Sequence, residues 1–121
     1  MTGQHASASD DAGLRGRLNA DLTAAMKRRD RPAVAVIRTL LGAIGNSEAV
    51  VLPDGPYDPT VGLGSDVPRR FLDESDLLAI LDEEIDAHRT GAEAAEVAGR
   101  TERAAGLRAE LEVLLRYRTD V

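Results

Sequence analysis

Four positively charged side chains within five residues are the strongest candidates for a binding function in this sequence. They are Lys27, Arg28, Arg29 and Arg31. Clustered cations of this kind engage phosphate groups electrostatically. Because no aromatic residue is interleaved with them, contact with folded RNA through its shape fits better than stacking on a single strand. A second interpretation stays open, since a helix end rich in Lys and Arg is also an ordinary solvated surface that suits the helix dipole.

The remaining residues that could act as nucleophile, general base or metal ligand do not indicate a catalytic site. The chain has no cysteine and no G-x-S-x-G motif, and it has just two histidines. His88 lies in an apolar helical stripe, so we expect a packed structural histidine rather than a general base. Four carboxylates near it point in diverging directions around a helix, which favours a solvated acidic face over a divalent-cation site: Asp82, Glu83, Glu84 and Asp86. We therefore expect no catalytic residue, no metal and no cofactor.

Charge is distributed unevenly along the chain. The formal net charge is −6, which argues against general affinity for polyanions. Residues 14–31 nevertheless carry six cations and two carboxylates, whereas residues 73–96 carry nine carboxylates and one arginine. The two segments could face each other, face a partner, or simply be solvated. The lack of cysteine, of a signal peptide and of any run long enough to span a bilayer predicts a soluble cytoplasmic protein without membrane contact.

Two helices joined by a tight corner organise the first half. The first is predicted over 13–29, with an apolar stripe of Leu14, Leu18, Leu22, Ala25 and Met26. The second is predicted over 31–49, with Asp30 as its N-cap and Pro32 just inside it. Its own stripe has strong core character and contains Val34, Ile37, Leu40, Leu41 and Ile44. Gly42 and Gly45 lie beside this stripe, where a close approach of helices would compensate for their low helix propensity.

Two further helices are predicted in the second half. The third opens near residues 73–75 and ends at Gly99, a suitable C-terminal cap. The fourth starts after Thr101, and its leucines align on one face. Val113 and Tyr117 lie four residues apart on a different side of that helix. Since this side has no obvious internal partner, we predict that it forms an exposed interaction patch.

The rest of the chain is predicted to be irregular. Residues 1–12 are small and polar, which indicates a disordered tail. Residues 50–70 hold four of the five prolines and are predicted to be a long Pro/Gly-rich loop between the second and third helices. The sequence thus predicts an all-α fold, a compact bundle of about four helices forming a single domain over 13–118.

Many spaced positions of these helices resemble the GatB/YqeY family. In the first half they read Leu18-Asn19-x-Asp21-Leu22-x-x-Ala25-Met26-Lys27-x-x-Asp30 and Ile37-Arg38-x-Leu40-Leu41-x-Ala43-Ile44-x-Asn46-x-Glu48. In the second half they are Ala98-Gly99-Arg100, Leu107, Glu110-Leu111, Leu114 and Tyr117. The resemblance covers about residues 14–117 apart from the loop.

The resemblance implies an all-helical module related to the tail of the B subunit of the glutamyl/aspartyl-tRNA amidotransferase, which helps hold tRNA. The amidotransferase chemistry belongs to other domains, so the chain is expected not to be an enzyme. If it binds tRNA, the candidates are the four corner cations and, more weakly, Arg100. Arg38 and Glu48 match family positions and are expected to serve packing and ion pairing. The alternative is a protein-interaction module or homo-oligomer, with Val113 and Tyr117 as the contact.

The sequence departs from the family pattern in three places. The short connection after the second helix is replaced by the long loop. The third helix carries acids where basic residues are usual, Asp86 among them, which weighs against RNA contact from that face. After Tyr117 the expected Leu-Pro is Arg118-Thr119, so the smaller C-terminal subdomain of the family is not expected here.

Overall fold

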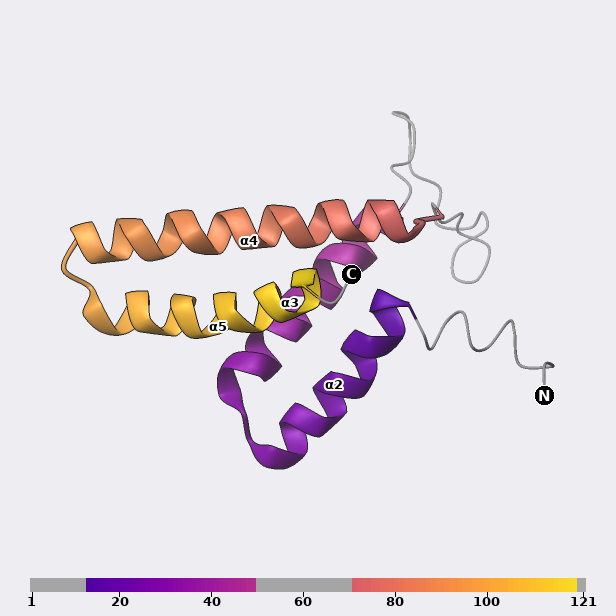
Figure 1. Cartoon of the computed structure of the whole chain (residues 1–121), viewed down its shortest axis with the longest axis horizontal. Helices are drawn as coiled ribbons and strands as arrows, with labels where there is room; N and C mark the ends of the chain where they lie inside the picture. The colour runs from indigo at the N-terminus through magenta and orange to yellow at the C-terminus, as the bar shows by residue number, and fades with distance from the viewer. Residues whose placement is uncertain (1–12, 50–70, 120–121) are drawn as a thin grey trace, which may run out of the picture.

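The described part of the chain is entirely built from helices. The computed structural model describes residues 13–49 and 71–119, which form α2 (Leu14–Arg28), α3 (Arg31–Glu48), α4 (Glu74–Val97) and α5 (Thr101–Thr119) (Figure 1). The all-α prediction is confirmed, and the helix bounds that were predicted, which did not include an end for the fourth helix, agree with the structure within two residues. The predicted tail at 1–12 and the predicted loop at 50–70 lie outside the described residues. None of the described helices is both long and apolar enough to cross a membrane.

Helix α3 is the centre of the arrangement. Helices α4 and α5 run antiparallel as a long hairpin, while α2 and α3 form a second pair joined by a sharp corner (Figure 1). Helix α3 packs against each of the other three helices. Of its five predicted stripe residues, Ile37, Leu40 and Ile44 are buried and the other two are partly buried. Val36, which lies outside the predicted stripe, is fully inaccessible to solvent. Burial of such side chains is the main favourable contribution to a fold of this kind.

Local signals in the sequence explain where the helices start. Asp30 caps α3 as predicted, because its carboxylate accepts a hydrogen bond from the Ala33 backbone N–H at 3.2 Å. Asp73 and Asp76 form a reciprocal capping box at the start of α4. The N-cap of α2, Gly13, offers no side-chain hydrogen bond, and Glu74 of α4 instead accepts from the Leu14 N–H at 3.3 Å.

Two left-handed residues end α2 and α4. Gly99 has φ 77° and closes α4, with the Arg100 N–H donating to the Ala95 carbonyl at 2.8 Å. Arg29 has φ 58° and closes α2 in the same way, with the Asp30 N–H donating to the Ala25 carbonyl at 3.0 Å. Both patterns are Schellman motifs, which satisfy carbonyls that the helix end leaves unpaired. Gly99 was predicted as a cap; Arg29, an L-residue in this conformation, was not.

Two predictions of exposure are wrong. Val113 and Tyr117 were expected on an uncovered side of the last helix, but they are 6% and 4% exposed. The reason is that α5 packs against α4 and also against α3, so a second side of the helix is covered. Met26, expected in the buried stripe of the first helix, is 50% exposed instead. Met26 therefore lies outside the core, although the neighbouring Ala25 is fully buried.

The predicted role of Gly42 and Gly45 is also wrong. A Cβ atom built at either position meets nothing within 4 Å, so neither glycine permits a close helix approach. The close approach is at Gly91 of α4 instead, where a Cβ atom would lie 3.3 Å from Cδ1 of Leu107 in α5.

Replacing Gly42 or Gly45 by alanine is expected to stabilise the protein. Each change should raise the free energy of unfolding by up to about 1 kcal/mol, because alanine loses less backbone entropy in a helix and the added methyl group has room. Urea unfolding monitored by circular dichroism measures the effect. Gly91→Ala is the matched control. Its free energy of unfolding should rise less, since Leu107 must shift to admit the methyl group. A loss of stability in Gly42→Ala would contradict the open surroundings of this glycine.

Candidate functional site

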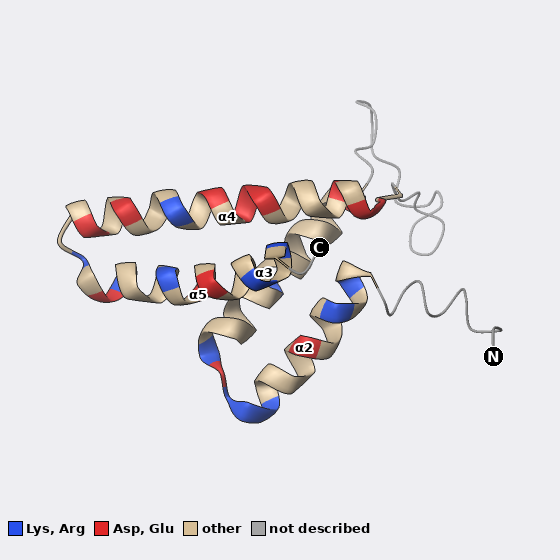
Figure 2. Cartoon of the chain, in the orientation of Figure 1, with Lys and Arg blue, Asp and Glu red and all other residues tan. Residues whose placement is uncertain are grey.

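The four candidate cations lie together at the corner between α2 and α3. Lys27 and Arg28 form the last turn of α2, Arg29 is its left-handed cap, and Arg31 opens α3. All four are exposed. We call these four residues the basic corner. Figure 2 shows it as a positively charged tip that projects away from α4.

The basic corner has an arginine, Arg29, in a left-handed backbone conformation that glycine adopts at a lower cost in free energy. A left-handed conformation brings Cβ close to the following carbonyl oxygen, a penalty of roughly 1–2 kcal/mol that glycine avoids. Arg29 adopts this conformation at φ 58° and ψ 42°. The Schellman hydrogen bonds and the Asp30 cap hold the backbone on either side of it. A strained position that carries a charged, exposed side chain is a reason to look for a function at this site.

The acidic helix does not neutralise the basic corner. Among residues 13–49 and 71–119, the one ion pair made by the four corner cations joins Arg28 to Asp30 at 3.3 Å. Two exposed carboxylates of α4 pair with α5 instead, Asp82 with Arg118 and Glu96 with Arg108, each at 2.8 Å. The opposite charges of the two segments thus occupy different parts of the molecule (Figure 2).

Arg100 lies apart from the basic corner. It is exposed in the turn that joins α4 to α5, at the far end of the hairpin (Figure 1). The structure therefore brings four of the five candidate nucleic-acid contacts together and places the fifth elsewhere.

A pocket that the sequence did not reveal adjoins the basic corner. It has a volume of about 220 Å³ and lies between α2, α3 and α5. Three arginines are among the residues that line it, Arg17, Arg28 and Arg116. The remaining lining residues are Asp21, Ala33, Ile37, Val113 and Tyr117. No short motif could have found this site, because its residues come from three helices and span most of the described chain.

Tyr117 forms one wall of this pocket and is tied to α2. Its hydroxyl donates a hydrogen bond to the Asp21 carboxylate at 2.5 Å, across 96 positions of sequence. The Arg17 guanidinium lies 5.2 Å from the centre of the Tyr117 ring, a cation–π arrangement. Burial, together with the hydrogen bond to Asp21 and its negative charge, raises the pKa of Tyr117 well above its ordinary value. The phenol is therefore neutral in the folded protein.

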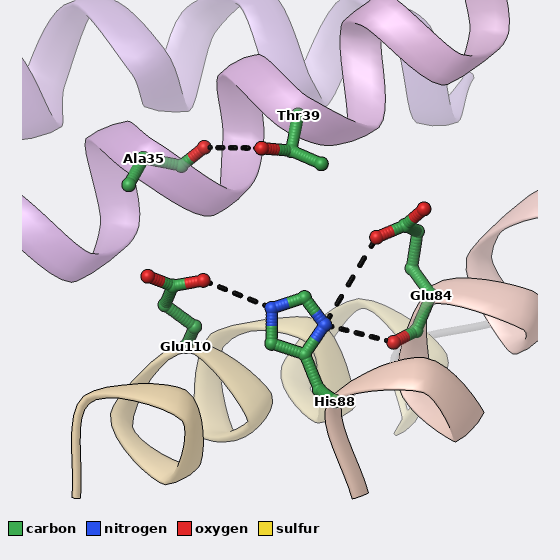
Figure 3. A network of polar contacts seen from close by, with 5 residues as sticks. All are labelled: Ala35, Thr39, Glu84, His88 and Glu110. Atoms are coloured by element: carbon green, nitrogen blue, oxygen red, sulfur yellow. Dashed lines mark hydrogen bonds and ion pairs between the residues drawn. The ribbon is translucent and has the colours of Figure 1, made fainter. Parts of the chain in front are cut away.

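His88 has the structural role predicted for it. It is buried, and Figure 3 shows its imidazole between α4 and α5. Nδ1 lies 2.9 Å from the Glu84 carbonyl oxygen and Nε2 lies 2.9 Å from the Glu110 carboxylate. Both ring nitrogens are thus engaged within the protein. Among the described residues, no group of three or more His, Asp or Glu side chains is placed to hold a metal ion.

Glu48 and Arg38, which match family positions, take part in contacts within the fold. Glu48 of α3 forms an ion pair with Arg15 of α2, which confirms its expected role. The Arg38 guanidinium contacts the sulfur of Met26 at 3.8 Å, which links the same two helices, and within residues 13–49 and 71–119 it forms no ion pair.

Comparison of this chain with family models, with curated proteins and with solved structures gave no match.

Proposed function

We propose that this protein is a non-catalytic helical module that contacts folded RNA, tRNA in particular, through the basic corner. The observation that carries the proposal is the corner itself: four exposed cations at one projecting tip, one of them on a strained left-handed backbone. The choice of tRNA rests on the resemblance of the helices to the GatB/YqeY family. That resemblance concerns spaced positions such as Asp21, Asp30 and Glu48. Membership of this family is therefore also part of the proposal.

The charge distribution supports RNA contact despite the net charge of −6. Exposed charges further apart than about 8–10 Å are largely screened at physiological ionic strength. An approaching phosphate therefore responds to the local cations rather than to the acidic helix. Neither aromatic residue in the described ranges belongs to the corner, since Tyr117 is buried and Phe71 precedes α4. Backbone contact with a folded RNA suits this surface better than base stacking.

The alternative function, a protein partner or self-association, has lost its proposed contact. Val113 and Tyr117 are part of the core, and they are only 6% and 4% exposed. Phe71 and Val97, two strongly exposed apolar side chains among the described residues, lie near opposite ends of α4 and do not form a common patch. The acidic face of α4 remains as the feature in favour of a protein partner. The cytoplasmic location expected from the lack of cysteine fits either function.

Binding of tRNA across a salt series tests the proposal. Labelled tRNA is titrated with the full chain, and fluorescence anisotropy is recorded between about 50 and 200 mM salt. The comparison variant changes Lys27, Arg28, Arg29 and Arg31 to glutamine. We expect saturable binding by the wild type, weaker binding by the variant, and a salt slope reduced by about one unit for each phosphate contact removed.

A matched control separates the corner from net charge. The control changes four exposed arginines of α4 and α5 to glutamine, namely Arg89, Arg103, Arg108 and Arg118. Both variants lose four positive charges, so a general electrostatic effect would weaken both equally. The proposal expects the control to keep the wild-type salt slope. Equal losses in the two variants, or no binding by the wild type at low salt, would refute it.

A further inference from the structure

We propose that the pocket between α2, α3 and α5 binds a phosphoryl group. Three arginines from two helices converge on it: Arg17 and Arg28 from α2, and Arg116 from α5. Arginine presents a planar fork of N–H donors that matches the oxygen atoms of a phosphate. Against these three positive charges the pocket has one carboxylate, that of Asp21. Its lining therefore favours an anion.

The one carboxylate among the lining residues, that of Asp21, accepts a hydrogen bond from a neutral donor. The Tyr117 hydroxyl donates a hydrogen bond to Asp21, which holds this carboxylate against the tyrosine. Arg17 lies over the face of the same tyrosine ring. The ring thus limits the conformations of the Arg17 guanidinium before any ligand arrives, which lowers the entropy lost on binding.

The other two pocket arginines, Arg28 and Arg116, make weak or no ion pairs with the described residues. The contact of Arg28 with Asp30 is 3.3 Å, longer than the 2.7–2.9 Å typical of a strong charge-assisted hydrogen bond. Arg116 is exposed and makes no ion pair with the described residues. The pocket also borders the first turn of α3 at Ala33, whose backbone N–H donates to the Asp30 carboxylate.

The size and floor of the pocket limit the ligand. Its volume of about 220 Å³ is below the roughly 300–1,000 Å³ of pockets that enclose drug-sized molecules. Ile37 and Val113 give the pocket an apolar part beside its arginines. A phosphoryl group with a small attached part fits these dimensions, whereas a whole nucleotide does not. That group could belong to a free phosphorylated molecule or to an RNA chain at the neighbouring corner.

Titration with inorganic phosphate tests the site directly. The Nε–Hε resonances of the pocket arginines are followed by NMR in the full chain, with chloride at equal ionic strength as the reference. We expect saturable shifts for the wild type and affinity about tenfold lower in Arg116→Gln, because one charge-assisted contact is lost. Arg17→Gln should behave in the same way. Shifts that fail to saturate, or that persist undiminished in Arg116→Gln, would overturn the inference.

Arg118→Gln is the matched control. It removes a positive charge two residues further along the same helix, from an exposed side chain that pairs with Asp82 and does not line the pocket. Phosphate affinity should be unchanged in it. An equal loss in Arg118→Gln and Arg116→Gln would show a general charge effect and overturn the inference.

Binding of tRNA to the same variants identifies the source of the phosphoryl group. If Arg116→Gln weakens tRNA binding and phosphate competes with tRNA, the group belongs to the RNA. If tRNA binding is unchanged while phosphate affinity falls, the ligand is a free phosphorylated molecule. The pocket does not depend on the proposed function, since phosphate binding without any tRNA binding would refute the RNA proposal and support this one.

Discussion

Tyr117→Ala is expected to lower the free energy of unfolding by about 3–5 kcal/mol, the range for removing a large aromatic side chain from a core. Tyr117 is 4% exposed and packs within the main apolar cluster. It also supplies the hydrogen bond that joins α5 to Asp21 of α2 and the ring on which Arg17 lies. Urea unfolding measures the loss. A change below about 1 kcal/mol would contradict the buried position of this residue.

Tyr117→Phe separates the hydroxyl from the ring. The ring stays buried, so the expected loss is about 1.5–3 kcal/mol, the value of one hydrogen bond to a charged acceptor. The contribution of the hydroxyl also depends on pH. The raised pKa of Tyr117 means that the unfolded chain releases this proton first, from about pH 10, while the folded chain retains it.

The sign of the pH effect follows from this difference in bound protons. Above pH 10 the folded state binds more protons than the unfolded state, so the stability of the wild type falls as the pH rises. Tyr117→Phe has no such proton. The stability difference between the two proteins is therefore expected to shrink above pH 10, in urea titrations run from pH 8 upward. A difference that stays constant would contradict a buried, neutral phenol.

The burial of Tyr117 also changes how self-association should be tested. A Tyr117→Glu variant would place a negative charge in the core and beside Asp21, so loss of an oligomer in it would report unfolding rather than a lost contact. Substitutions on the exposed face of α4 avoid this problem.

The sequence predicted the helices well because their signals are local. The N-cap of α3 depends on Asp30 and a donor three residues away, and the end of α4 depends on Gly99 adopting a left-handed conformation. Each of these features involves residues within one or two turns of each other.

The packing between helices could not be predicted in the same way. A periodic stripe identifies one apolar face, but it does not reveal that α5 has a second covered face with Val113 on it. The Tyr117–Asp21 contact and the arginine pocket depend on how α2 and α5 are placed by α3. The basic corner was predictable because its four cations are adjacent in sequence, and its position relative to Arg100 was not.

The first helix gives the sharpest test of where the core ends. Leu18 and Met26 were predicted to share one buried stripe of α2, and the structure separates them: Leu18 is fully buried and Met26 is half exposed. Leu18→Ala is expected to cost about 2–5 kcal/mol, because it removes buried methyl groups and leaves a cavity. Met26→Ala is expected to cost about 1 kcal/mol or less, since little of its surface is taken from water.

The two variants share one helix and one type of substitution, so the difference between them reports burial rather than helix propensity. Urea unfolding of both, with the denaturant slope compared to that of the wild type, gives the two free energies. Equal losses would mean that the stripe stays buried through the end of α2. The basic corner would then be anchored to the core at Met26, and its cations would lie closer to the body of the protein than the structure places them. A large loss for Leu18→Ala alone would support a core boundary that lies between Leu18 and Met26 on this side of α2.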